Sequence, residues 1–114
     1  MNPQTRELVY ARQGGYCWWC GGALPERWAL HHRQLRKQGG SDEPHNLVAL
    51  HHECHNVRTG SVHLTVRTAV ERGFLVPSWD DPATVSLRIH GGETVRLHPD
   101  GTTTREAREH EHGW

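Results

Sequence analysis

The sequence predicts a small α+β domain that begins with a helix, continues through short strands and contains a β-hairpin near its C-terminal end. Three observations predict it: helix-forming residues at the start, two short apolar runs in the middle and alternating apolar residues further on. The 114 residues fit one domain. Only 34% of them are apolar, against about 45–50% in typical globular proteins, so the core can only be modest.

The first predicted element is a helix over residues 3–13, which a Gly-Gly pair ends. Two short strands are predicted next, over residues 28–32 and 46–50. A polar loop over residues 34–41, with its own Gly-Gly pair, separates the two strands. The middle of the chain should therefore be a pair of short strands joined by a loop.

Two more elements are predicted in the second half of the chain. A helix over residues 65–73 has an apolar face made by Val66, Ala69 and Val70. A β-hairpin follows, because apolar residues alternate on both sides of a Gly-Gly turn. The alternating residues are Val85, Leu87 and Ile89 before the turn and Val95 and Leu97 after it.

These elements divide the chain into three expected parts. Residues 1–76 form the main domain, residues 77–102 a β-hairpin extension packed on or beside it, and residues 103–114 a polar, flexible tail. The N-terminal stretch lacks the apolar centre of a secretion signal, and no window approaches the roughly 18 apolar residues of a membrane span. We therefore expect a cytoplasmic protein.

Charge says little about partners, whereas histidine content says more. The net charge is zero, with an excess of three positive charges in residues 1–72 and of three negative charges in residues 73–114. This asymmetry is compatible with nucleic-acid binding and equally with ordinary surface charge. Seven of the eleven histidines lie between residues 31 and 63. Histidine is a frequent metal ligand and proton acceptor, so this density favours a functional site.

The three cysteines belong to two pairs of residues with the same spacing. Cys17 and Cys20 form one pair, and His51 and Cys54 form the other, with two residues between the members of each. This spacing predicts a tetrahedral Cys3His site for a structural zinc ion. An odd cysteine count favours metal over disulfides. Three free or buried cysteines are the alternative, and His52 is an alternative to His51 as the fourth ligand.

The order of these motifs resembles that of the HNH (His-Asn-His) endonucleases. The matching pieces are Cys17 with Cys20, His31-His32, Gly39-Gly40, Asn46-Leu47, and His51 with Cys54-His55. The resemblance covers roughly residues 14–75 and is specific, because order, spacing and residue types agree. The stretch from His63 to the hairpin is similar to small HNH proteins encoded by phages and prophages of actinobacteria.

The resemblance implies a ββα-metal (His-Me finger) domain that cuts DNA phosphodiester bonds with the help of a divalent cation. In that scheme His32 is the general base that takes a proton from water. His31 and His55 bind the catalytic ion, which could be Mg²⁺, Mn²⁺, Ni²⁺ or Zn²⁺, and the ion stabilises charge on the leaving oxygen. Asn46 orients the loop that carries His32.

The last ligand of the catalytic ion departs from the family pattern. Some HNH nucleases carry a histidine four residues after the last histidine of the motif, and Thr59 occupies that position here. We expect His63 to take this role after a short insertion. The alternative is an ion with two protein ligands whose shell is completed by water and phosphate.

Three basic residues after the histidine pair are candidates for DNA binding. Arg33, Arg36 and Lys37 could contact phosphates or form a solvated loop. Trp18 and Trp19 are expected in the core. Histidines without motif support are expected at the surface, namely His45, His90, His98, His110 and His112.

Two functions remain open from the sequence. The first is a DNA endonuclease that, by the resemblance, works beside the large terminase subunit during phage genome packaging. The second is a non-catalytic zinc module that binds nucleic acid or a protein partner. His32 beside a set of metal ligands favours the enzyme, because a binding module needs no such group.

Overall fold

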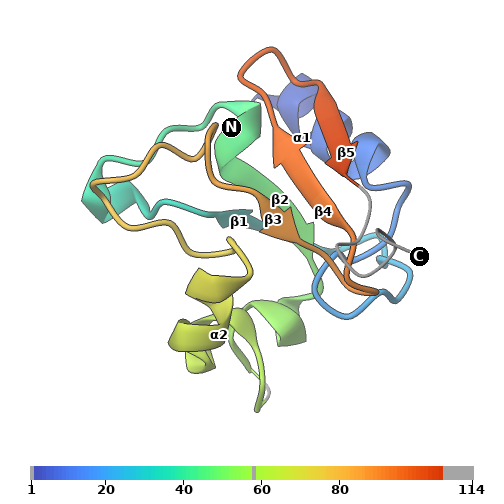
Figure 1. Ribbon diagram of the computed structural model, residues 1–114. Coiled ribbons are helices and arrows are strands. Elements are labelled where there is room, and N and C mark those ends of the chain that lie inside the picture. The colour runs from blue at the N-terminus through green and yellow to red at the C-terminus, as the bar shows by residue number, and fades with distance from the viewer. Residues whose placement is uncertain (1, 58, 107–114) are drawn as a thin grey trace, which may run out of the picture.

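The computed structural model describes residues 2–57 and 59–106 and contains two small antiparallel sheets and two α-helices (Figure 1). The first sheet pairs β1 (Ala29–His32) with β2 (Leu47–Leu50), and the second has the order β3 (Leu87–Arg88), β4 (Thr94–Leu97) and β5 (Thr103–Glu106). The helices are α1 (Pro3–Arg12) and α2 (Val66–Glu71). Short 3₁₀ turns lie at Arg36–Gln38, Pro44–Asn46 and Val62–Leu64, and a π-helical turn lies at Glu53–Val57.

The predicted N-terminal helix is confirmed as α1. The Asn2 side chain caps its first turn by accepting a hydrogen bond from the Gln4 N–H at 2.8 Å. Gln13, just after the helix, binds both backbone groups of Ala49: its Nε2 donates to the carbonyl at 2.8 Å, and its Oε1 accepts from the N–H at 2.7 Å. A side chain thus takes the place of a neighbouring strand along β2 and attaches α1 to the sheet.

β1 and β2 are the two strands predicted in the middle of the chain. They pair antiparallel, and His31 lies opposite Val48. All four residues of β2 are buried, whereas β1 alternates between buried and partly exposed residues. His31 and His32 therefore point to opposite faces of β1, since neighbouring side chains on a strand alternate.

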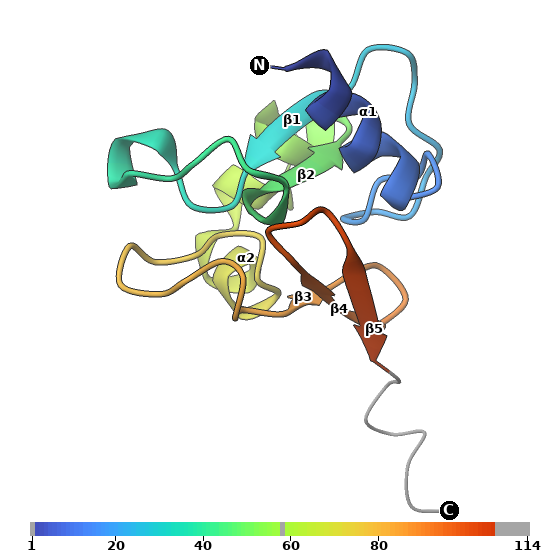
Figure 2. The ribbon, with the colours of Figure 1, turned by 90° about the horizontal axis from the view of Figure 1, so that it is seen from above.

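The predicted hairpin is confirmed as β3 and β4, and it shares the core of the rest of the protein. Leu87, Val95 and Leu97 belong to the same cluster of buried apolar side chains as Val9 of α1 and Leu47 of β2. The backbone N–H of His90 donates to the Trp18 carbonyl at 2.7 Å. Figure 2 shows the two sheets beside each other, with α1 next to the first.

A third strand, β5, lies where a flexible tail was expected. Residues 103–106 pair with β4, whereas residues 107–114 of the expected tail lie outside the described residues. β5 is an edge strand whose side chains are mostly exposed, so no alternation of apolar residues marks it in the sequence.

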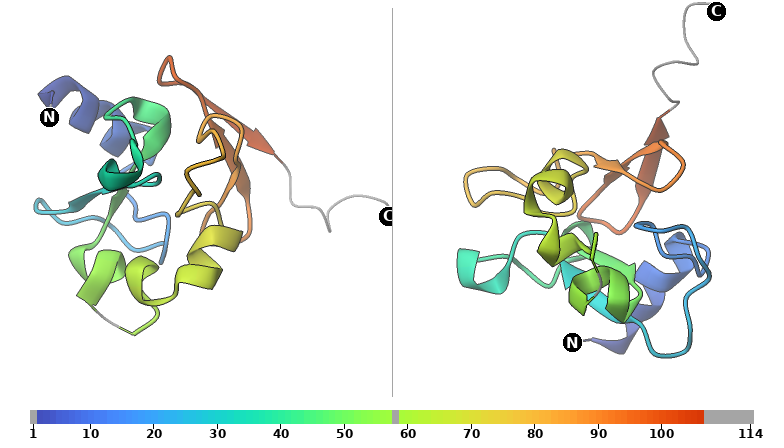
Figure 3. Two further views of the ribbon diagram at one scale, coloured as in Figure 1. Left: turned by 90° about the vertical axis from the view of Figure 1, so that its left-hand side faces the viewer. Right: turned by 90° about the horizontal axis from the view of Figure 1, so that it is seen from below.

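The second helix forms where it was predicted, but its apolar face was assigned wrongly. Ala69 is buried, whereas the side chains of Val66 and Val70 are 56% and 41% exposed. α2 is only six residues long and lies with the turns at Glu53–Val57 and Val62–Leu64 at one end of the molecule, away from α1 (Figure 3). Within residues 2–57 and 59–106, neither the length nor the apolar content of any helix reaches what a bilayer crossing requires.

Candidate metal centres

The two predicted pairs of zinc ligands lie together in the structure. Candidate ligand atoms of Cys17, Cys20, His51 and Cys54 all lie within 4.8 Å of one another. The first pair sits on a tight turn after α1, closed by a 2.7 Å hydrogen bond from the Gly21 N–H to the Cys17 carbonyl. The second pair follows directly after β2. Three sulfurs and one imidazole nitrogen are a donor set that fits a structural zinc ion.

His51, rather than His52, is the histidine of this group. Its Nδ1 lies 3.3 Å from the sulfur of Cys20 and 3.8 Å from that of Cys54. Its Nε2 lies 2.8 Å from the Ala23 carbonyl, which can only accept, so the proton sits on Nε2 and Nδ1 faces the sulfurs. A backbone carbonyl that orients a ligating imidazole in this way is typical of metal sites. The His52 side chain is exposed.

The three thiols differ in their readiness to ionise. Burial raises the pKa of Cys17, and burial together with Cys17 raises that of Cys54 to about 12. Burial also opposes ionisation of Cys20, but hydrogen bonds from the Gly22 N–H and from neighbouring side chains outweigh it and lower its pKa to about 7. At neutral pH a metal ion must therefore displace protons from this group when it binds.

A second group consists of three histidines from three different elements. His31 comes from β1, His55 from the π-helical turn and His63 from the 3₁₀ turn before α2. Candidate ligand atoms of the three lie within 4.8 Å of one another, and the Nε2 atoms of His55 and His63 are 3.1 Å apart. His63, eight residues after His55, thus lies close to the other two candidate ligands.

His31 provides the clearest test of whether this group fits a metal ion. The residue is fully buried, and its Nε2 donates to the Phe74 carbonyl at 2.5 Å. Its Nδ1 is buried without a hydrogen-bond partner. An unsatisfied buried polar atom costs about 1–3 kcal/mol, and a bound cation would remove this cost. The group therefore fits a metal ion.

The histidines of this group are neutral at physiological pH. Burial, reinforced by the neighbouring imidazoles, lowers the pKa of His31 to about 3 and that of His55 to about 4. Burial also lowers the pKa of His63. Each neutral ring therefore has one unprotonated nitrogen that can bind a cation, and an all-imidazole set suits transition ions better than Mg²⁺.

His32, the expected general base, lies on the opposite face of β1 from this group. Its Nε2 is 2.7 Å from Oδ1 of Asp42, whose carboxylate also contacts the Arg36 guanidinium at 3.2 Å. The hydrogen bond from His32, helped by Arg36, holds the pKa of Asp42 below its usual range. Asp42 could not be recognised from the sequence, because a single aspartate in a polar loop matches no motif.

Asn46 is fully buried and closes the loop between the two strands. Its Nδ2 donates to the carbonyls of Gln34 (3.0 Å) and Ser41 (2.8 Å), and its Oδ1 accepts from the Gln34 N–H at 2.7 Å. The loop is tight at Gly40, where a Cβ atom would lie 1.8 Å from the Gln34 carbonyl oxygen. Asn46 thus fixes both ends of the loop that follows the histidine pair.

The prediction that Arg33 contacts DNA is wrong. Its side chain is fully buried and donates to the carbonyls of Gly73 (2.8 Å), His45 (2.8 Å), Pro82 (2.8 Å) and Val85 (2.6 Å). All of its guanidinium nitrogens are therefore occupied by the protein itself, and it joins the end of β1 to residues 73–85. Arg36 and Lys37 are exposed and stay available to a ligand.

His45 and the two neighbouring tryptophans, Trp18 and Trp19, are all buried. His45, expected at the surface, is buried at the end of the loop that Asn46 closes, where its carbonyl accepts from Arg33. Trp18 and Trp19 are in the core as predicted. The Arg72 guanidinium lies 4.1 Å above the Trp19 ring, a cation–π contact beside the Cys17–Cys20 turn.

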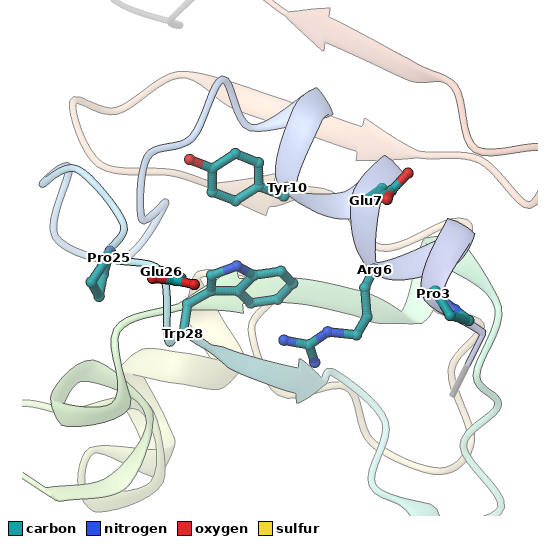
Figure 4. A pocket seen from close by; sticks show the side chains of 7 residues that line it. All are labelled: Pro3, Arg6, Glu7, Tyr10, Pro25, Glu26 and Trp28. Carbon is teal, nitrogen blue, oxygen red and sulfur yellow. The ribbon is translucent and has the colours of Figure 1, made fainter.

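A groove of about 660 Å³ lies between α1 and the segment before β1 (Figure 4). The Arg6 guanidinium lies 4.2 Å above the Trp28 ring there, and Tyr10 stacks near the same ring. No residue of this groove belongs to either ligand group. The candidate metal ligands therefore do not line this groove.

The comparisons with known proteins agree with the motifs. No curated protein and no solved structure matches the chain. The family model described as HNH endonuclease matches the segment from the turn with Cys17 to the residues just after His55, so His63 lies beyond it. Residues 15–60 of this chain thus match the HNH endonuclease family.

Proposed function

We propose that this protein is a metal-dependent endonuclease that hydrolyses DNA phosphodiester bonds, nicking one strand or cutting both with low sequence specificity. The observation behind the proposal is the position of His32: it follows a buried histidine of the three-histidine group, inside the segment that matches the HNH family. A module that only binds has no use for a proton acceptor next in the chain to a candidate metal ligand.

His31, His55 and His63 would hold the catalytic ion. When bound, the ion supplies a positive charge that stabilises the leaving 3′ oxygen of the phosphodiester. His32 takes the proton from the attacking water, a role that suits an imidazole near neutral pH. Asn46 keeps the loop after His32 closed, so the ring is held in a fixed direction. In this proposal, β1, β2 and the π-helical turn would make up the ββα-metal unit, with one turn in place of a longer helix.

The Cys3His group would hold a zinc ion that supports the fold. It joins the turn after α1 to the segment after β2, and His55 follows its last ligand directly in the chain. Because the apolar core is modest and stabilises the fold only weakly, metal binding can contribute much of the folding free energy. Loss of zinc should therefore affect the whole domain.

Arg36 and Lys37 are the proposed DNA contacts, because both are exposed on the loop after His32. We further propose the setting that the family resemblance implies, which is phage DNA processing beside a large terminase subunit in the cytoplasm of a bacterium or infected host. Co-purification with such a subunit would test this partner, and its absence would restrict the proposal to DNA cleavage.

A plasmid-nicking assay with added Mg²⁺, Mn²⁺, Ni²⁺ or Zn²⁺ tests the proposed function. His32→Ala should reduce cleavage by roughly 10²–10⁴-fold, the usual contribution of a general base, and leave zinc content and melting temperature unchanged. His52→Ala, which changes an exposed histidine outside both groups, is the matched control and should cleave like the wild type.

Two results would contradict the proposal. Folded, zinc-loaded wild type that cleaves DNA with none of the four ions would indicate a non-catalytic zinc module. A His32→Ala protein that cleaves normally would show that another group activates the water.

A further inference from the structure

We propose that Asp42 is a positioning residue for His32: its carboxylate holds the imidazole so that Nδ1 is the nitrogen that accepts a proton from water. This inference rests on the proposed function, in which His32 is the general base. Asp42 is not one of the motif residues that carry the resemblance to the HNH family, and its role is inferred from its contacts with His32 and Arg36.

The contact between the two side chains defines the tautomer. Oδ1 of Asp42 lies 2.7 Å from Nε2 of His32, and an ionised carboxylate can only accept, so Nε2 carries the proton. Arg36 Nε is 3.5 Å from the same nitrogen, too far to compete with the shorter bond. Among the described residues Nδ1 of His32 has no hydrogen-bond partner. The His32 side chain is 15% exposed, so water can reach it.

The loop that carries Asp42 is held in place by Asn46. Asn46 donates to the Ser41 carbonyl at 2.8 Å, one residue before Asp42, and binds both backbone groups of Gln34 at the start of the loop. Within the described part of the chain, Asn46 makes no hydrogen bond to the His32 ring. Asn46 therefore acts on His32 indirectly: it holds Ser41, the residue before Asp42, and Asp42 contacts the His32 ring.

Arg36 fixes the carboxylate from the other side. Its NH2 group lies 3.2 Å from Oδ1 and 3.4 Å from Oδ2 of Asp42. The exposed guanidinium restrains the carboxylate while one oxygen faces His32. Because a side chain that is 51% exposed has few other restraints, the two contacts decide where the carboxylate points.

Steady-state cleavage kinetics of the full chain test this role. Asp42→Ala should lower kcat roughly 10–100-fold, the loss typical when a partner that orients a metal-ligating histidine is removed, with KM for DNA nearly unchanged. Asp42→Asn should recover most of the rate, because its amide oxygen still accepts from Nε2. Asp80→Ala removes an exposed carboxylate with no side-chain hydrogen bond among the described residues and should behave like the wild type.

Imidazole nitrogen NMR of the zinc-loaded protein gives a readout that does not depend on activity. Wild-type His32 should show the tautomer protonated at Nε2, and Asp42→Ala should show a mixture of tautomers. An unchanged or raised kcat in Asp42→Ala, a change in KM alone, or the same tautomer in both proteins would overturn the inference. If the wild type cleaves no DNA but the tautomers differ, the proposed function fails while the positioning contact stands.

Discussion

The Cys3His group and the three-histidine group resemble each other in compactness but differ in how they are built. The first takes its four ligands from two local pairs, each with two residues between its members. The second takes three ligands from three elements, β1 and two short turns. The thiols are mostly protonated at neutral pH, whereas the three imidazoles are neutral. The first group must therefore release protons when it binds an ion, whereas the second can bind one with almost no proton release.

The largest effect should follow from breaking the Cys3His group. Cys54→Ser removes one ligand, so the protein should lose its zinc and its melting temperature should fall by roughly 10 °C or more, since each kcal/mol is worth about 4–8 °C in a chain of this size. Elemental analysis and thermal unfolding measure the two effects. If the variant kept its zinc and its melting temperature, the Cys3His group would not be what stabilises the fold.

Substitution of His55, the residue that follows Cys54, should give a different result. His55→Ala leaves the four zinc ligands intact but removes one nitrogen of the other group, so cleavage should be lost while one zinc ion per chain and most of the thermal stability remain. Cleavage assays, metal content and melting temperature measured on the same sample separate the two groups. Loss of zinc in this variant would mean that the ligands are divided between the two groups in a different way.

A smaller effect, measurable without mutation, is the number of protons released on metal binding. At pH 6 the thiols are protonated, so zinc binding to the metal-free protein should release about three protons. The pKa values of His31 and His55, about 3 and 4, lie below this pH, so Ni²⁺ added to the zinc-loaded protein should release almost none. Calorimetry in buffers of different ionisation enthalpy counts the protons. Release of two protons with Ni²⁺ would indicate histidines of ordinary pKa, near 6.5.

The parts of the site that local spacing defines were predictable from the sequence. The two pairs of zinc ligands lie on tight turns, where two intervening residues fix the geometry, and the structure groups them. His63 was harder to assign, because its distance from His55 depends on the path of residues 59–62 and not on spacing. Asp42 could not be found at all, since its role depends on how Asn46 closes the loop.

Long-range packing explains the predictions that were wrong. Arg33 follows the histidine pair in the sequence and looked like a DNA contact, but carbonyls 12 to 52 residues away enclose it. β5 lacks an apolar pattern because its partner, β4, supplies the buried side chains. Val66 and Val70 have helical spacing but lie exposed, because α2 reaches the core through Ala69.

Cys54 and His55 are neighbours in the chain yet belong to different ligand groups. One peptide bond therefore transmits the position of the zinc ligand to the histidine of the proposed catalytic group. Without zinc, the chain would therefore lack an ordered second group and, in the proposed function, could not cleave DNA. The supply of one trace metal would then control the proposed nuclease activity of a newly synthesised chain.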